Sequence, residues 1–190
     1  HLLTAYLSYS AIFPKDYEMH YWAGQLARDL KDYGQAADSF RHAALTGKDN
    51  PKILRGALLN QIEVAETSGN KPLRMRAYQD YLDLQPEGPH AYKVKYQIAH
   101  IKYDEKDYQD AAQRFYELAR TPQNSAENKT LQVQSADLAL DALAALKDDE
   151  HLETWGQRLA EAIPSKKIEF LAIARKASLN MMARLLTTGA

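Results

Sequence analysis

The sequence contains no cysteine among its 190 residues. This absence excludes disulfide frameworks, cysteine-ligated zinc and thiol nucleophiles, but it leaves the compartment open because cytosolic and periplasmic proteins can both lack cysteine. Long apolar runs are also absent, and residues 2–13 lack the basic flank of a signal peptide. We therefore expect a chain that is not inserted directly into a membrane.

A surplus of positive charge is absent as well. The chain has 24 Lys and Arg against 25 Asp and Glu, which gives a formal net charge of −1. Proteins that bind nucleic acids usually carry a basic surplus that neutralises phosphates, so nucleic acid is not the expected partner. The hydrophobic fraction of 45% and the charged fraction of 26% are typical of a soluble globular protein.

Residue types that favour β-strands are scarce. There are 3 Val and 8 Ile against 29 Ala and 24 Leu, and Ala and Leu lose little side-chain freedom in a helix. The 7 prolines are spread along the chain, where each marks a turn or the first turn of a helix. The composition predicts an all-α fold.

The sequence repeats itself. Residues 5–14 and 77–86 share Ala, Tyr, Tyr and Pro at a shift of 72 positions. Residues 32–44 and 107–119 share Asp, Tyr, an Ala pair, Phe and a final Ala at a shift of 75 positions. Because residue types and spacing agree in both blocks, they indicate a structural unit that recurs along the chain.

Four of the prolines divide that unit in two. Pro14, Pro51, Pro86 and Pro122 are spaced 37, 35 and 36 residues apart. Each interval accommodates two helices of roughly 12–16 residues joined by short turns. The predicted helices are 2–12, 16–31, 34–46, 52–68, 72–84, 90–105, 108–120, 126–147, 149–162 and 167–187.

The residues within these pairs resemble the tetratricopeptide-repeat (TPR) family. That family places a small residue on the first helix, A-x3-F on the second helix and a proline at the end. Here Gly24 is followed by Ala36-x3-Phe40, and the later copy has Ala111-x3-Phe115. The resemblance implies a right-handed α-α superhelix, or solenoid, of about ten helices, in which the small residues let paired helices approach closely.

Applied to the whole chain, the resemblance implies a single TPR-like solenoid over residues 1–190. It is close in the first and third pairs and looser elsewhere, and Gly156 stands where the family has an aromatic residue. The pairs are expected at 16–50, 51–86, 87–122 and 123–164, with helices 2–12 and 167–187 left without a partner.

Signatures of catalysis and metal binding are missing. The 8 glycines are scattered rather than gathered in a phosphate-binding loop, the histidines show no metal-ligand spacing, and no local signature marks a Ser-His-Asp triad. Carboxylate pairs one helical turn apart, such as Glu63 with Glu66, are typical of solvated helix faces. We expect a protein that is not an enzyme and that holds no metal and no cofactor.

In TPR proteins the first helices of successive pairs line a concave face that binds peptides or partner domains. Some members clamp a terminal carboxylate there with Lys and Asn, but Tyr21 and Gln25 stand in those positions, so that activity is not expected. Tyrosine is a large, amphipathic contact residue, although each ring could equally pack between repeats. The resemblance implies these residues for the face: Tyr21, Gln25, Arg28, Leu59, Glu63, Glu66, Tyr96, His100, Tyr103, Asp137 and Asp141.

The last predicted helix has more apolar surface than one neighbouring helix can cover. One stripe consists of Phe170, Ile173, Ala174, Ala177 and Met181. Four further residues extend the apolar surface beyond that stripe: Leu171, Leu179, Met182 and Leu186. We expect these four to form a contact, either with a following helix or by self-association. Basic residues are frequent in the same region: Lys166, Lys167, Arg175, Lys176 and Arg184.

We interpret the chain as a non-catalytic scaffold that binds a protein or peptide within a larger bacterial assembly. Its Tyr-rich repeats resemble those of bacterial envelope proteins, which favours the periplasm over the cytoplasm. An alternative is a helical accessory or regulatory domain of a larger enzyme, and flanking sequence would distinguish the two. Binding of single-stranded RNA is disfavoured because the carboxylates at 63, 66, 137 and 141 would make the groove acidic.

Overall fold

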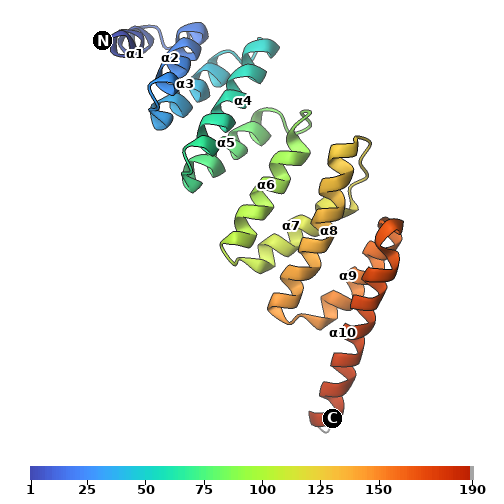
Figure 1. Cartoon of the computed structure of the whole chain (residues 1–190). Coiled ribbons are helices and arrows are strands. Elements are labelled where there is room, and N and C mark those ends of the chain that lie inside the picture. Colours follow the sequence, from blue (N-terminus) through green and yellow to red (C-terminus); the bar gives the residue numbers. More distant parts are fainter. Residues whose placement is uncertain (189–190) are drawn as a thin grey trace. The chain divides into compact units, whose positions relative to one another are not determined.

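The computed structural model describes residues 1–188, and over that range the chain forms ten α-helices, one 3-10 turn and no strand (Figure 1). Every predicted helix is confirmed to within two residues at each end. The 3-10 turn at Pro164–Lys166 was not predicted. The helices are α1 (Leu2–Ile12), α2 (Tyr17–Asp29), α3 (Tyr33–Thr46), α4 (Pro51–Thr67), α5 (Lys71–Leu84), α6 (Ala91–Asp104), α7 (Tyr108–Arg120), α8 (Ala126–Leu146), α9 (Asp149–Ala162) and α10 (Lys167–Thr188).

The chain divides into two compact units. The first unit is His1–Ala91, and the second unit begins at Tyr92. In the first unit α2 packs against α3 and α4, and α3 packs against α4 and α5. In the second unit α7 packs against α8 and α9, and α9 packs against α10. Helices therefore contact mainly those next to them in sequence, which agrees with stability that comes from stacked neighbours.

Three of the tight turns between helices have the same geometry. Lys31, Lys106 and Lys147 adopt left-handed backbone conformations, with φ of 62°, 62° and 57°. In each turn the lysine N–H donates to the carbonyl three residues earlier, and the N–H of the following aspartate donates to the carbonyl five residues earlier, at 2.9–3.0 Å. Gly69, with φ of 66°, occupies the corresponding place between α4 and α5. This repeated Lys-Asp turn fixes the angle at which the second helix of a pair departs.

Helix starts are set by polar side chains that cap them. In these caps a side-chain oxygen accepts a hydrogen bond from a backbone N–H two or three residues later, which satisfies a donor that the first turn leaves free. The capping residues include Asp16, Asp32, Asn50, Asn70, Ser125 and Asp148. The boundaries that the sequence predicted therefore have a local chemical cause.

The core of the first unit depends on close approach between α2 and α3. Ala36 and Phe40 are fully buried, and they cluster with Ala27 and with Val64 of the following pair. A Cβ atom added to Gly24 would lie 2.8 Å from the ring of Phe40, which is closer than carbon atoms pack. The predicted need for a small residue at this position is confirmed.

A buried polar network also joins three helices of the first unit. The carboxylate of Asp80 on α5 accepts hydrogen bonds from Arg41 Nε on α3 at 3.0 and 3.1 Å, and from Gln61 Nε2 on α4 at 2.7 Å. Gln61 is fully buried. Buried charges are tolerated when they are paired in this way, so the network ties α3, α4 and α5 together.

The second unit has a larger apolar core of the same kind. Ala111 and Phe115 on α7 are fully buried, and they belong to one cluster with Leu159 and Phe170. A Cβ atom on Gly156 would lie 3.0 Å from the carbonyl oxygen of Phe170. The glycine that departs from the family pattern thus allows α9 and α10 to pack closely. Within residues 1–188, no helix has both the length and the apolar character that crossing a bilayer requires.

Candidate partner-binding surfaces

In the first unit, α2 and α4 present a hydrogen-bonded cluster of polar side chains. Asn60 on α4 donates from Nδ2 to the hydroxyl of Tyr21 at 2.8 Å, and its Oδ1 accepts a hydrogen bond from Arg28 Nη1 at 3.1 Å. Arg28 also lies 3.8 Å from the carboxylate of Glu63. Three predicted residues are therefore brought together, and Asn60, which the sequence analysis missed, connects them.

The other predicted residues of the first unit are arranged differently. Gln25 and Leu59 are half-buried on α2 and α4. The carboxylate of Glu66 accepts a hydrogen bond from the hydroxyl of Tyr78 on α5 at 2.6 Å. Burial, together with this bond, raises the pKa of the Tyr78 hydroxyl far above its ordinary value. Glu66 is thus engaged by α5 and is not part of the Asn60 cluster.

In the second unit, Tyr96 is mainly a packing residue. It is 9% exposed, and its ring lies edge-on to that of Phe115 at 5.6 Å between centroids. Its hydroxyl donates a long hydrogen bond of 3.4 Å to Gln134 Oε1 on α8. The sequence left open whether each tyrosine ring contacts a partner or packs between helices, and for Tyr96 the structure shows packing.

Tyr103 and His100 remain more accessible on α6. The ring of Tyr103 packs edge-on against Tyr108 at 5.2 Å. Burial, and next the nearby charge of Asp141, raise the pKa of the Tyr103 phenol. His100 Nδ1 lies 3.4 Å from the carboxylate of Asp104, one turn along the same helix.

Asp137, one turn before Asp141 on α8, is paired with a cation that the sequence did not single out as its partner. The Lys166 ammonium lies 3.5 Å from the Asp137 carboxylate and 2.8 Å from that of Glu169. Partial burial raises the pKa of Asp137, and the ammonium opposes that shift. The predicted carboxylate pair on α8 is therefore divided between two different environments.

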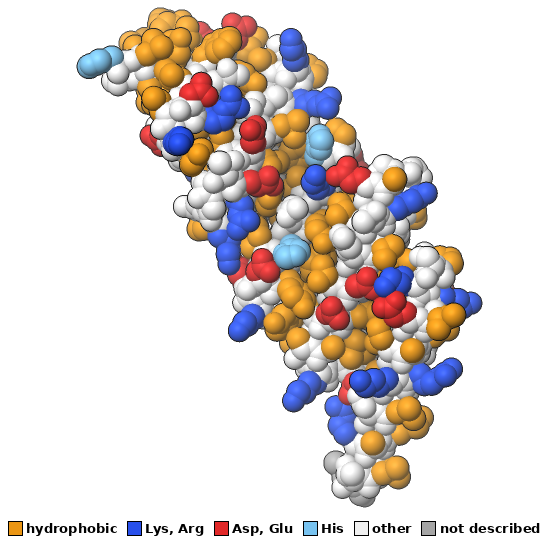
Figure 2. Space-filling model, viewed as in Figure 1, with side chains coloured by type: hydrophobic (Ala, Val, Ile, Leu, Met, Phe, Trp, Pro, Cys, Tyr) orange, Lys and Arg blue, Asp and Glu red, His pale blue; other side chains and the backbone are white. Residues whose placement is uncertain are grey.

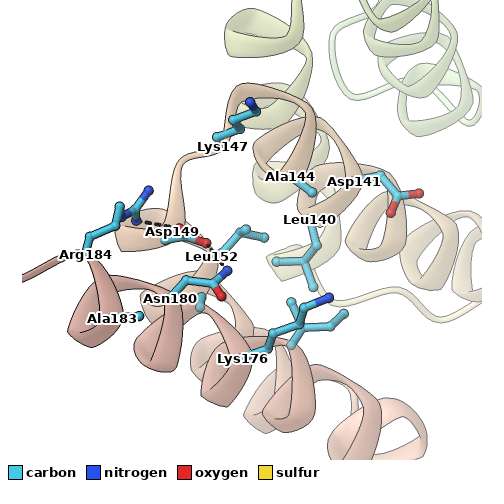
Figure 3. Close-up of a pocket in the computed structure, with 12 residues that line it drawn as sticks. Leu140, Asp141, Ala144, Lys147, Asp149, Leu152, Lys176, Asn180, Ala183 and Arg184 are labelled. Atoms are coloured by element: carbon cyan, nitrogen blue, oxygen red, sulfur yellow. Dashed lines mark hydrogen bonds and ion pairs between the residues drawn. The ribbon is translucent and has the colours of Figure 1, made fainter. Parts of the chain in front are cut away.

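A cavity of about 580 Å³ opens between α8, α9 and α10 (Figure 3). Its apolar walls include Leu140, Leu152, Ile173 and Ala177. Charged and amide side chains complete the lining: Asp141, Lys147, Asp149, Lys176, Asn180 and Arg184. Of the residues predicted for the concave face only Asp141 is among them, although the basic character of the last helix was visible in the sequence.

One side of this cavity is held by an ion pair in which the carboxylate is buried and the arginine side chain is 57% exposed. The side chain of Asp149, 9% exposed, accepts hydrogen bonds from Arg184 at 2.5 Å and from Asn180 at 3.2 Å, drawn as dashed lines in Figure 3. The carboxylate comes from the start of α9, and both of its donors come from α10. The charge of Asp149 is thus compensated within the wall of the cavity.

A second cavity of about 760 Å³ lies over α7, α8 and α9. It is lined by Asp107, Asp110, Leu143, Leu146, Asp148, His151 and Trp155, among others. Its carboxylates already have cationic or imidazole neighbours, because Asp110 pairs with Arg114 at 2.9 Å and Asp148 contacts His151 at 2.7 Å. Trp155 stacks on Tyr116 with 4.0 Å between ring centroids.

The two apolar faces of α10 have different environments. Phe170, Ala174 and Ala177 are buried. The predicted contact residues are uncovered in the structure, and hydrophobic side chains are visible towards the C-terminal end in Figure 2. Their exposed fractions are 37% for Leu171, 60% for Leu179, 59% for Met182 and 85% for Leu186. The expectation that another segment covers them remains a prediction.

Among residues 1–188, no group of three or more His, Asp or Glu side chains is placed so that it could hold a metal ion. No protein-family model, no curated protein and no solved structure matches this chain.

Proposed function

We propose that the protein is a non-catalytic interaction scaffold built as a TPR-like right-handed superhelix. On this proposal the first helices of successive pairs carry the surface that binds a partner segment or domain, within a larger bacterial assembly. Packing between successive helices, the repeated Lys-Asp turn and the buried Ala-x3-Phe residues support the repeat architecture. Each is a consequence expected of stacked helix pairs.

The observation that carries the binding role is the cluster on α2 and α4. Tyr21 and Arg28 are half-buried, and Asn60 holds both through hydrogen bonds of 2.8 and 3.1 Å. Tyrosine and arginine contribute disproportionately to binding energy at protein interfaces. Side chains already ordered in the free protein lose less conformational entropy on binding, so this cluster is suited to contact a partner.

Affinity capture from an extract of the source cells, followed by mass spectrometry, tests the proposal. The double change Arg28→Ala with Asn60→Ala should reduce recovery of the main partner while far-ultraviolet circular dichroism stays unchanged. Arg55→Ala serves as a control, since Arg55 is an exposed residue of α4 outside the cluster. Equal recovery with the wild type, the double variant and the control would contradict a binding role for α2 and α4.

A further inference from the structure

We infer that the cavity between α8, α9 and α10 binds a partner peptide in which an acidic side chain stands next to a bulky apolar one. The inference rests on the proposed function and specifies the chemistry of the segment that the scaffold would hold. It concerns the second unit alone, and it does not depend on the cluster around Asn60 in the first unit.

The apolar part of the ligand follows from the walls and the size of the cavity. Leu140, Leu152 and Ala177 are 2%, 7% and 2% exposed, so their packing against the protein is nearly complete and the walls are preformed. The volume of about 580 Å³ lies within the range of roughly 300–1,000 Å³ that is usual for ligand sites. An apolar side chain that enters the cavity would be removed from water without rearrangement of these residues.

The acidic part follows from the charges. Asp149 is already compensated by Arg184, and the one other carboxylate that lines the cavity is that of Asp141. Lys147 and Lys176 also line the cavity. Among the described residues neither lysine has a carboxylate within ion-pair distance. With three cations against two carboxylates, the lining has a net formal charge of +1, and this positive charge beside an apolar wall favours a ligand that carries a negative charge.

The position of the two lysines narrows the class of ligand. Lys147 stands at the left-handed turn that ends α8, and Lys176 extends from the middle of α10 (Figure 3). They reach the cavity from the turn after α8 and from α10, and they flank an apolar wall, an arrangement that suits a carboxylate set close to an apolar group. A nucleic acid or a lipid surface would instead be attracted by a continuous basic surface.

Short peptides acetylated at one end and amidated at the other test the inference, because they contain no terminal carboxylate. The probe sequence is GLEELG, and the comparison peptides are GLQQLG, GLKKLG and GGEEGG. Binding to the full 190-residue chain is followed by fluorescence anisotropy of a labelled peptide and by amide chemical shifts. We expect GLEELG to bind about tenfold more tightly than each of the others, since it alone supplies both negative charge and apolar surface. The amides that shift should include Ala144, Ala177 and Asn180.

The double change Lys147→Gln with Lys176→Gln should lower the affinity for GLEELG about tenfold. Lys129→Gln with Lys167→Gln is the matched control: these lysines are exposed on α8 and α10 and lie outside the cavity lining. The control should bind as the wild type does. Circular dichroism of both variants checks that the helices are retained.

Three results would overturn the inference: equal binding of GLEELG and GLQQLG, amide shifts outside the cavity, or equal losses in the two double variants. Tighter binding to phosphatidylserine vesicles or to a single-stranded oligonucleotide than to GLEELG would overturn it too. If the peptide experiment fails while Arg28→Ala with Asn60→Ala still reduces partner capture, the proposed function stands and only this inference is lost. If the peptide binds the cavity but capture is unaffected, the role of α2 and α4 is lost.

Discussion

The helix pairs α2–α3 and α6–α7, related by a shift of 75 residues, place an aromatic pair in the same way. Tyr21 meets Phe40 edge-on at 5.5 Å, and Tyr96 meets Phe115 edge-on at 5.6 Å. The two hydroxyls also have corresponding partners, because each bonds to an amide side chain on the next first helix of its own unit. Sequence similarity at this shift therefore corresponds to similar local geometry.

The pairs differ two turns further along. At the shift of 75 residues, Arg28 corresponds to Tyr103. Arg28 donates a hydrogen bond to Asn60 on α4 and so belongs to a polar cluster. Tyr103 instead packs against the ring of Tyr108 in an aromatic cluster. The tyrosine, phenylalanine and small residues therefore maintain the pair, while the residue seven positions after the tyrosine sets the chemistry of the surface.

Removing the buried ring of either phenylalanine, Phe40 or Phe115, should cause the largest loss of stability. Phe40 and Phe115 are both fully buried, so Phe40→Ala and Phe115→Ala should each lower the free energy of unfolding by about 3–5 kcal/mol. Denaturant unfolding followed by circular dichroism measures both losses. Leu45→Ala, at a residue that is 40% exposed, should cost far less. If only one of the two phenylalanine variants lost stability, the two helix pairs would not be equivalent.

Enlarging the small residues should have the next largest effect. Ala36 and Ala111 are fully buried at the contact between the two helices of a pair, and leucine there would overpack the contact and cost about 1–3 kcal/mol. Ala145→Leu, at an exposed site on α8, is the control. A melting temperature that Ala111→Leu leaves unchanged would contradict the proposed repeat register.

The hydrogen bonds between the two tyrosines and their amide partners should differ in energy between the two helix pairs. The bond from Asn60 to Tyr21 is 2.8 Å long and the bond from Tyr96 to Gln134 is 3.4 Å, so the first should be the stronger. One double-mutant cycle combines Tyr21→Phe with Asn60→Ala, and the other combines Tyr96→Phe with Gln134→Ala. The first should give a coupling energy of about 1 kcal/mol, and the second should give less. Equal couplings would mean that the difference in length has no energetic consequence.

The smallest effect should come from the Lys-Asp turns, and it should be a gain. Left-handed backbone is unfavourable for lysine and accessible to glycine, so Lys31→Gly and Lys106→Gly should each raise the free energy of unfolding by about 0.5 kcal/mol. Gly69→Ala places a side chain on the equivalent left-handed backbone and should lower the free energy of unfolding. Thermal unfolding of the three variants side by side is the measurement, and destabilisation by Lys31→Gly would show that the lysine side chain itself supports the turn.

The sequence predicted the helices because prolines, capping residues and the 75-residue shift define their limits locally. It predicted the site less completely because the partners of each residue come from the next helix pair. Asn60 follows Tyr21 by 39 residues and Gln134 follows Tyr96 by 38, and no local pattern links them. Likewise, nothing near Asp149 in sequence indicates that Arg184 will neutralise it. Helix periodicity indicated which side of α6 carries Tyr96, but the depth of its ring depends on the contact with Phe115.

Packing between successive helices has a consequence for the kinetics of folding. Since the main contacts join helices that are adjacent or next but one in sequence, forming each contact closes only a short stretch of chain. Chains with such local contacts fold quickly, and folding can begin at any pair and spread to its neighbours. We therefore expect unfolding to proceed in parts, with hydrogen exchange fastest in α1 and in the last turns of α10, where few residues are buried. A chain of stacked helices of this kind can lose a terminal helix and regain it while its central pairs stay folded.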